Sequence, residues 1–189
     1  REIASLLRND GKFQDQVTME FIRNIERFSP MHDIGKVGVR DGILLKPGKL
    51  TAEEYEEMKK HTVYGANVLK AANENIARSG SNLFLPGIEI AENHHEKWDG
   101  TGYPYGKKGE EIPLSARIVA VADVFDALTS KRPYKEAFSF DKAFEIIEKG
   151  RGKHFDPDII RILVKNKERI RSIYESFYKK PGLDQNTTW

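Results

Sequence analysis

The feature that most restricts the fold of this chain is a nearly unbroken apolar run from Ile118 to Leu128, which follows Pro113. Pro is favoured in the first turn of a helix, and a run without strand-type alternation predicts a helix that is central and buried. Two acids, Asp123 and Asp126, interrupt this run. Burying a carboxylate is costly unless a cation or strong hydrogen bonds compensate. We therefore expect both acids to need partners.

Helical periodicity also dominates the rest of the chain, and the alternating patterns that are typical of strands are scarce. Thr51 and Glu54 predict a capping box at the start of a helix that continues to about Ala72 and turns His61 inward. Further helices are expected near residues 2–8, 18–28 and 88–98, and from Asp156, as N-cap, to about Phe177. The pattern predicts an all-α fold.

Length and composition restrict the class of protein. The 189 residues suffice for one domain with a substantial core. Lys plus Arg total 31 against 29 Asp plus Glu, so a net charge of +2 predicts no binding to a nucleic-acid duplex or an anionic membrane. No apolar stretch approaches the about 18 residues of a membrane-spanning helix, and no signal peptide is evident, so we expect a soluble, cytoplasmic protein.

Histidines and acids provide the candidate metal ligands, because the absence of cysteine excludes thiolates. Alone, an inward His is more often a hydrogen-bonded core residue than a ligand. Four of the five histidines, however, fall where helix faces turn inward or helices begin: His32, His61, His94 and His95. Together with Asp33 and Asp123 they suit iron, manganese, nickel or zinc, and the set suffices for a binuclear centre that hydrolyses a phosphate ester. The fifth, His154, is interpreted as structural.

Three cations are candidates for contacts with a phosphate. Lys36 lies three residues after Asp33, which is one turn away if this segment is helical. Arg132 and Lys135 follow the helix that carries Asp123. An Arg fork matches pairs of phosphate oxygens, and Lys acts as a point charge. Any one of these cations, taken alone, is more often a solvated surface residue.

These motifs, taken in order, resemble the HD-GYP family. The resemblance is carried by residues 32–36 (HDIGK), 44–50 (LLKPGKL), 94–104 (HHEKWDGTGYP), 122–129 (ADVFDALT), 131–135 (KRPYK) and 152–157 (GKHFDP), together with the segment around His61. It covers most of the chain from Ser29 to about Ile160. A lone His-Asp pair is a weak signal, whereas this ordered set is highly specific.

The resemblance implies a helical bundle around two or three divalent metal ions, iron or manganese, that hydrolyses cyclic di-GMP to linear pGpG, and on to GMP, in bacterial signalling. It implies Asp33, as bridging ligand, and Lys36 as catalytic residues, and Lys36, Arg132 and Lys135 as substrate-binding residues. The ligands that it implies are His32, Asp33, His61, His94, His95 and Asp123.

The resemblance also bears on partners and domain limits. The Gly102-Tyr103-Pro104 loop is expected to shape the rim of the site or to contact a signalling domain such as a GGDEF domain. The HD-GYP domain is expected to span residues 1–180, followed by a tail over 181–189. Members of the family usually supply a further His, and sometimes a Glu, from a helix upstream. This chain has no His before His32, and we expect that this ligand was removed with a missing N-terminal part.

Three alternatives to this function are kept. In the first, the domain is a catalytically idle module that binds a cyclic dinucleotide or docks another protein. In the second, it is a phosphodiesterase for another cyclic dinucleotide. A third alternative retains the metals but changes the reaction to that of a di-iron oxygenase. Metal content, product analysis and oxygen consumption distinguish these alternatives.

Overall fold

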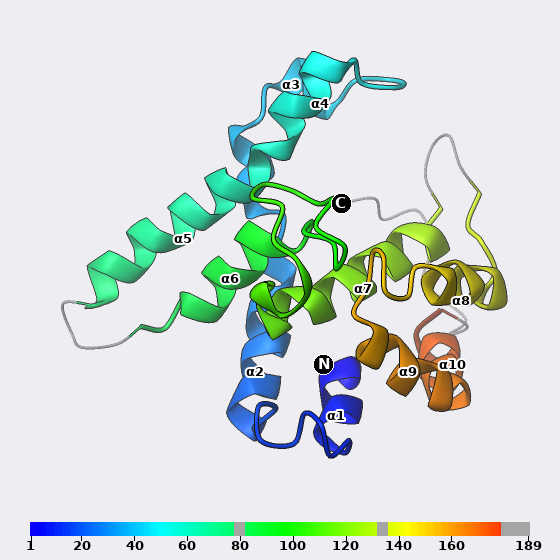
Figure 1. The fold of residues 1–189 in the computed structure, drawn as a ribbon. Helices are drawn as coiled ribbons and strands as arrows, with labels where there is room; N and C mark the ends of the chain where they lie inside the picture. Colours follow the sequence, from blue (N-terminus) through cyan, green and yellow to red (C-terminus); the bar gives the residue numbers. More distant parts are fainter. Residues whose placement is uncertain (78–81, 132–135, 179–189) are drawn as a thin grey trace.

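The computed structural model describes residues 1–77, 82–131 and 136–178, and within these ranges it is helical (Figure 1), with one isolated bridge between Arg151 and Phe155. The α-helices are α1 Glu2–Arg8, α2 Met19–Phe28, α3 Asp41–Leu44, α4 Ala52–Lys59, α5 His61–Ala77, α6 Leu85–Asn93, α7 Leu114–Thr129, α8 Phe140–Lys149, α9 Pro157–Lys165 and α10 Lys167–Tyr178. The 3-10 helices are η1 Ser29–Met31, η2 Ile34–Gly38 and η3 Gly109–Glu111. The predicted all-α fold is confirmed. In the described ranges no helix is both long and apolar enough to cross a membrane.

Helix α7 crosses the middle of the molecule, between α5 and α6 on one side and α8 and α9 on the other (Figure 1). Its first half is buried, as at Ile118 and Val121. Pro113 precedes its first residue, as predicted. The expectation that Asp126 lies in a buried stretch is wrong, because the face of α7 that carries Ala122 and Asp126 is exposed. Asp123, by contrast, is half-buried.

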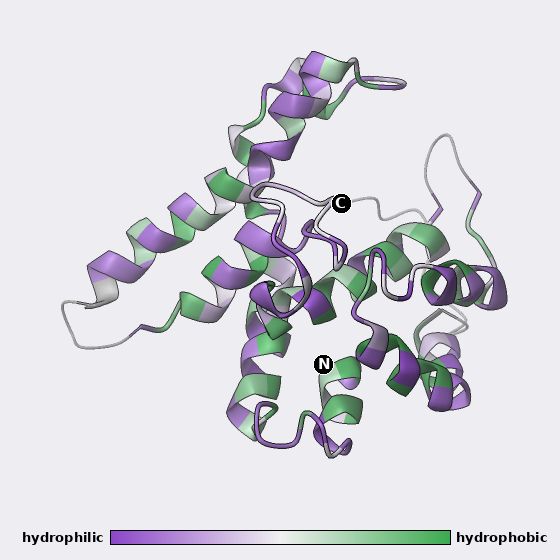
Figure 2. Ribbon diagram, in the orientation of Figure 1, coloured by the Kyte–Doolittle hydropathy of each residue, from purple (hydrophilic) through white to green (hydrophobic). Residues whose placement is uncertain are grey.

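Two hydrophobic clusters stabilise the bundle. The larger one joins α1, α2, α7, α8 and α9. The smaller one consists of Ala66 and Leu69 on α5 with Ile88 and Ala91 on α6. Met31, in η1, packs against both clusters, so the segment that continues into the His-Asp motif lies where they meet. Figure 2 shows hydrophobic and hydrophilic residues interleaved along the helices, as expected for amphipathic helices with one buried face.

The predicted capping box at Thr51 is confirmed, but the helix that follows is divided. The Thr51 hydroxyl accepts a hydrogen bond from the Glu54 amide at 3.2 Å, and the Glu54 carboxylate accepts one from the Thr51 amide at 2.7 Å. Helix α4 then ends at Lys59, and α5 begins at His61. His61 is buried as predicted, with 1% exposure, whereas Val68, further along α5, is exposed.

Other helix limits also differ from prediction. The helix expected over 88–98 is α6, which ends at Asn93, so the histidine pair follows it. The last helix begins as predicted, with the Asp156 side chain accepting hydrogen bonds from the first-turn amides. It is divided at Asn166, whose side chain donates a hydrogen bond to the Ile162 carbonyl, and the separate α10 leaves Phe177 exposed. Helix α8 was not predicted, although Ser139 caps it.

The absence of a side chain at Gly35 brings η2 against the first turns of α5. A Cβ atom at this position would lie 1.9 Å from the carbonyl oxygen of His61 and 2.3 Å from the amide nitrogen of Gly65. Only glycine permits such close packing of two backbones. This packing places Asp33, which precedes η2, beside His61, which begins α5.

Candidate metal centre

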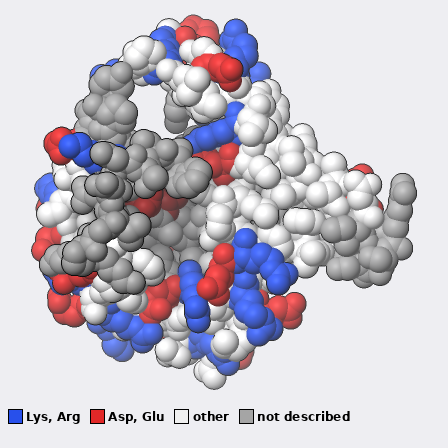
Figure 3. Space-filling model, turned by 180° about the vertical axis from the view of Figure 1, so that it is seen from behind, with Lys and Arg blue, Asp and Glu red and all other residues white. Residues whose placement is uncertain are grey.

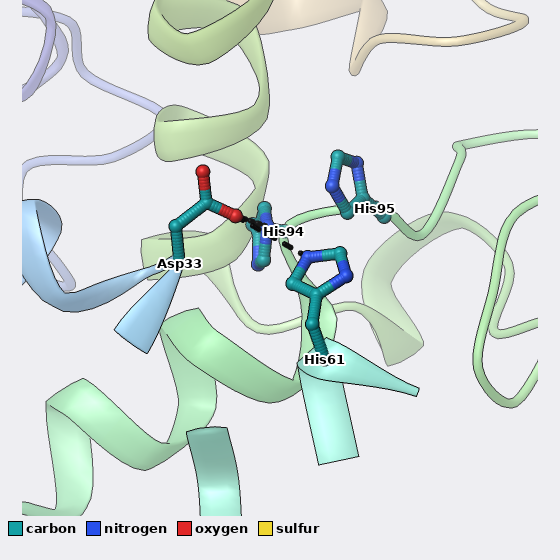
Figure 4. Close-up of side chains that lie close together, drawn as sticks. All are labelled: Asp33, His61, His94 and His95. Carbon is teal, nitrogen blue, oxygen red and sulfur yellow. Dashed lines mark ion pairs between the residues drawn. The ribbon is translucent and has the colours of Figure 1, made fainter. Parts of the chain in front are cut away.

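Three segments that lie far apart in the sequence contribute the side chains of one cluster (Figure 4). Asp33 precedes η2, His61 begins α5, and His94 and His95 directly follow α6. One potential ligand atom from each of these residues lies within 4.8 Å of those of the other three. We refer to Asp33, His61, His94 and His95 as the His-Asp cluster.

Backbone carbonyls orient two of the cluster imidazoles. Nδ1 of His61 is 2.7 Å from the Met58 carbonyl oxygen, and Nδ1 of His94 is 3.1 Å from the carbonyl oxygens of both Ile90 and Ala91. A ring nitrogen that donates to a carbonyl carries the proton, so the other nitrogen, Nε2, keeps its lone pair. Both rings therefore direct a potential ligand atom into the cluster, as in many metal-binding histidines.

The atoms that meet in the cluster have no hydrogen bond to compensate their burial. Oδ1 of Asp33 and Nε2 of His61 and His94 are buried, and none has a hydrogen-bond partner among the residues that the structure describes. Oδ1 of Asp33 is 3.3 Å from Nε2 of His61 and 3.8 Å from Nε2 of His94. Buried lone pairs that face one another are costly unless a cation lies between them. This donor set fits a metal ion.

Asp33 directs its second oxygen to a different set of partners. Oδ2 accepts a hydrogen bond from Nζ of Lys36 at 2.5 Å and lies 3.3 Å from Nε2 of His32. Nε2 of His32 is also 3.5 Å from Oδ1 of Asp123, and its Nδ1 lies 2.9 Å from the Ser29 carbonyl oxygen. The carboxylate of Asp33 therefore lies between two groups: His61 and His94 on one side, and His32 with Asp123 on the other. The structure thus brings together all six residues that were predicted as ligands.

Burial and neighbouring charges set the protonation states of these groups. Burial lowers the pKa of His94 to about 4 and that of His95 to about 3, and neighbouring histidines contribute in the same direction. Both rings are therefore neutral near pH 7, as metal binding requires. Burial opposes the charged form of Asp33, but the contacts of its carboxylate with His32 and Lys36 outweigh it and hold its pKa well below the ordinary value.

His32 behaves in the opposite way to His94 and His95. Burial lowers its pKa, but hydrogen bonds to Asp123 and Asp33 outweigh this effect and raise the pKa to about 10. The pKa of Asp123 is lowered, because the interaction with His32 outweighs its burial. Without a metal, His32 is therefore a cation between two carboxylates. The carboxylates of Asp33 and Asp123 stabilise a positive charge at this position.

Of the remaining candidates, Lys36 and the Gly102-Tyr103-Pro104 loop lie beside the cluster. Nζ of Lys36 lies 2.5 Å from Oδ2 of Asp33, and its contact with a phosphate stays a prediction. Arg132 and Lys135 lie outside the described residues. The Gly102-Tyr103-Pro104 loop returns to the cluster, where the Tyr103 amide donates a hydrogen bond to the His95 carbonyl at 3.2 Å.

Glu96 is a residue that the sequence analysis missed. Its side chain is 2% exposed, and its Oε1 accepts a hydrogen bond from the Tyr105 amide at 2.7 Å. The available signal was its position directly after the histidine pair, where a buried acid needs a partner.

The surface charge agrees with the low net charge. Figure 3 shows the molecule from behind, and on that face Lys and Arg side chains are mixed with Asp and Glu. On the part of this face that the structure describes, no broad area carries one sign of charge.

The sequence of this chain is similar to those of known proteins. A family model for the HD domain matches residues 20–159. A cyclic di-GMP phosphodiesterase of Vibrio cholerae is 46% identical over 178 residues, which are 94% of this chain and 36% of that protein. The 3′3′-cGAMP-specific phosphodiesterase 2 of the same organism is 43% identical over 152 residues, which are 80% of this chain and 28% of that protein.

A solved structure shares the fold. The crystal structure of a cyclic GMP-AMP specific phosphodiesterase from V. cholerae superposes with a TM-score of 0.52 and 19% identity, over 90% of this chain and 44% of that one. This likeness concerns the fold alone. The chain spans less than half the length of the curated relatives it matches, for example 40% and 36% of two Vibrio cholerae proteins.

Proposed function

The chain belongs to the HD domain family, and on this premise we propose that it is a metal-dependent phosphodiesterase of the HD-GYP type that hydrolyses cyclic di-GMP. The observation that carries this proposal is the set of buried atoms without hydrogen-bond partners, Asp33 Oδ1 and Nε2 of His61 and His94, that converge on one point. A module that only binds a nucleotide or a protein does not need such costly atoms inside it. The names of similar proteins provide the substrate class.

The proposed ligands are those expected from the sequence, and the proposed metals are two or three divalent ions of iron or manganese. Nitrogen and oxygen donors without sulfur suit these metals. Asp33 is proposed as the bridging ligand, because one of its oxygens faces His61 and His94 and the other faces His32. Bound divalent ions supply an activated water and stabilise charge on a phosphoryl group.

The side chains of this chain would orient and bind the substrate. Lys36 holds Oδ2 of Asp33 at 2.5 Å, and its side chain is 41% exposed. Its ammonium group is therefore fixed beside the cluster and still accessible to a phosphate oxygen, so we propose it as the cation that binds the scissile phosphate. For Arg132 and Lys135, binding of substrate phosphate stays a prediction.

The proposed reaction opens cyclic di-GMP to linear pGpG and continues to GMP. A second candidate substrate is 3′3′-cGAMP, because a relative named for that specificity is 43% identical to this chain. Cyclic di-GMP is preferred because the relative that bears its name aligns over a larger share of the chain, 94% against 80%. Docking of a GGDEF domain through the Gly102-Tyr103-Pro104 loop also stays a prediction.

The test is product analysis with defined metal content. The chain is stripped with EDTA, reloaded with Mn²⁺ or Fe²⁺, and incubated separately with cyclic di-GMP and 3′3′-cGAMP before chromatography. We expect metal-dependent formation of pGpG. The Asp33→Ala variant should lose bound metal and turnover together, with a fall in kcat of about 10⁴-fold, the scale for removing one member of a catalytic unit.

The matched control is Asp41→Ala, which removes an exposed aspartate on α3 and should leave metal content and rate unchanged. Metal-dependent hydrolysis that survives in Asp33→Ala would contradict the bridging role. Binding of cyclic di-GMP by the metal-loaded chain without any product would instead identify a receptor. Oxygen consumption would identify an oxygenase.

A further inference from the structure

His95 is held differently from the other histidines of the His-Asp cluster. Among the residues that the structure describes, no backbone carbonyl accepts a hydrogen bond from its ring, whereas His61 and His94 each have such a bond. The ring of His95 instead packs against the rings of His61, His94 and Tyr103. Its centroid lies 4.1 Å from that of His94 and 4.8 Å from that of Tyr103, with an angle of 31° between the His95 and Tyr103 planes.

Tyr103 is in turn supported by residues of α4. The ring of Tyr55 meets it edge-on, with centroids 6.3 Å apart and an angle of 82° between the planes. Nζ of Lys59 lies 5.7 Å from the centroid of Tyr103 and 5.5 Å from that of Tyr55, within the range of cation–π attraction. These contacts limit the rotation of the Tyr103 side chain, which is partly buried.

The backbone of the loop is also fixed to the residues that follow the histidine pair. The Tyr103 amide donates to the His95 carbonyl, and the Tyr105 amide donates to the buried carboxylate of Glu96. At Gly102, a Cβ atom would lie 2.3 Å from the Lys97 nitrogen and 2.5 Å from the Cα atom of Glu96. The two backbones therefore pack directly against each other, and the loop is held at Gly102 and at Tyr105, on either side of Tyr103 in the sequence.

We infer that Tyr103 is a positioning residue for the metal centre, whose ring orients the imidazole of His95 toward the His-Asp cluster. The inference rests on the proposed metal centre and extends it to a residue outside the ligand set. Ring packing takes the place of the carbonyl hydrogen bond that orients His61 and His94. Because the face of the ring makes this contact, phenylalanine should replace Tyr103 and an aliphatic residue should not.

The experiment is a Mn²⁺ titration of the full chain after EDTA treatment. We expect Tyr103→Leu to weaken Mn²⁺ binding about ten- to a hundredfold, the range found when a residue that orients a metal ligand is replaced. Tyr103→Phe should stay within about threefold of the unchanged protein, because it retains the ring. The matched control is Tyr105→Leu, in the same loop, whose side chain is 56% exposed and should not affect the affinity.

A second comparison distinguishes positioning from general support of the fold. In a His95→Ala background, Tyr103→Leu should cause no further loss of affinity, because no imidazole remains for it to orient. An equal loss in both backgrounds would overturn the inference, and so would a Tyr103→Leu variant that binds Mn²⁺ as tightly as the unchanged protein. If circular dichroism shows that Tyr103→Leu does not fold, Tyr103→Met, which is flexible and has no flat ring, replaces it with the same expectations.

The two proposals fail in different ways. If the unchanged chain binds no Mn²⁺, both the proposed function and this inference are overturned. If the unchanged chain binds Mn²⁺ and forms pGpG but Tyr103→Leu has the same affinity, only the inference fails.

Discussion

Two buried polar groups in this protein differ in whether their atoms are paired. Arg117 and Asp156 form an ion pair at 2.6 Å, and both side chains are almost fully buried. Nε of Arg117 donates to the Ile112 carbonyl, and the other oxygen of Asp156 accepts from amides at the start of α9. In the His-Asp cluster, by contrast, Asp33 Oδ1 and two imidazole nitrogens face one another without partners among the described residues.

The difference separates a structural polar group from a functional one. A buried charge with every atom paired holds parts of the fold together, as Arg117 joins α7 to the start of α9. Buried atoms that remain unpaired reduce stability unless a ligand binds them. The first group should therefore determine the stability of the protein without metal. The second should determine how much stability a metal adds.

The largest effect on stability is expected from the paired group. Asp156→Ala leaves the Arg117 guanidinium buried without its partner and removes the cap of α9, so the free energy of unfolding should fall by about 3–5 kcal/mol. Urea denaturation of the metal-free chain measures this change, and Asp41→Ala serves again as the control, with almost no effect. A loss below about 1 kcal/mol, the scale of an exposed pair, would remove the distinction between the two groups.

The next largest effect on the free energy of unfolding is expected from metal binding at the His-Asp cluster. Mn²⁺ at a free concentration of a hundred times its Kd should raise the free energy of unfolding by about 2.7 kcal/mol, since only the folded chain presents the site. His61→Asn should abolish this gain and change the stability of the metal-free chain by only about 1 kcal/mol, because Nε2 has no partner and the Asn amide keeps a donor for the Met58 carbonyl in place of Nδ1. Thermal unfolding with and without Mn²⁺ provides the comparison. An equal gain in both proteins would show that His61 is not a ligand.

Counted per pH unit and per histidine, about 1.4 kcal/mol, the smallest effect is a pH dependence of the metal-free chain. His94 and His95 have pKa values of about 4 and about 3 in the folded protein, below the ordinary value of 6.5. As the pH falls below 6.5, the unfolded chain binds these protons first, so the free energy of unfolding should decrease toward pH 4. His32, with a pKa raised to about 10, contributes stability below pH 6.5 that is lost as the pH rises through 10.

Urea denaturation between pH 7 and pH 4.5 in EDTA measures this slope. His95→Gln removes one of the two protons, so it should reduce the slope by at most about 1.4 kcal/mol per pH unit. A slope that does not change in His95→Gln would mean that His95 is not buried in its neutral form.

Local sequence patterns predicted several elements well. The N-caps Thr51 and Asp156 follow from nearby residues, because a cap is a hydrogen bond within one turn. The helices predicted near residues 2–8 and 18–28 are α1 and α2. The comparisons confirm the HD-GYP resemblance, which rested on ordered motifs. Helix ends were predicted less well. The ends of α6 at Asn93 and of α9 at Lys165 interrupt patterns that continue in the sequence.

The candidate site was predicted as a set of residues but not as an arrangement. His61 was expected to point inward because helical periodicity places it on the apolar face. Nothing local indicated that Tyr103 packs on His95. Asp123 and Asp126 looked equivalent in the sequence, yet one lies beside His32 and the other is exposed, because Asp126 shares an uncovered face of α7 with Ala122.

The sequence by itself determined the chemical nature of this protein: helices, nitrogen and oxygen ligands without sulfur, and almost no net charge. Tertiary structure alone decided which oxygen of Asp33 meets which histidine, and it paired Arg117 with Asp156 across 39 positions. The physical reason is the separation along the chain over which each kind of interaction acts. Caps and periodicity act over one or two turns, whereas the packing of Gly35 against α5 and of the Tyr103 loop against His95 depends on how distant segments meet.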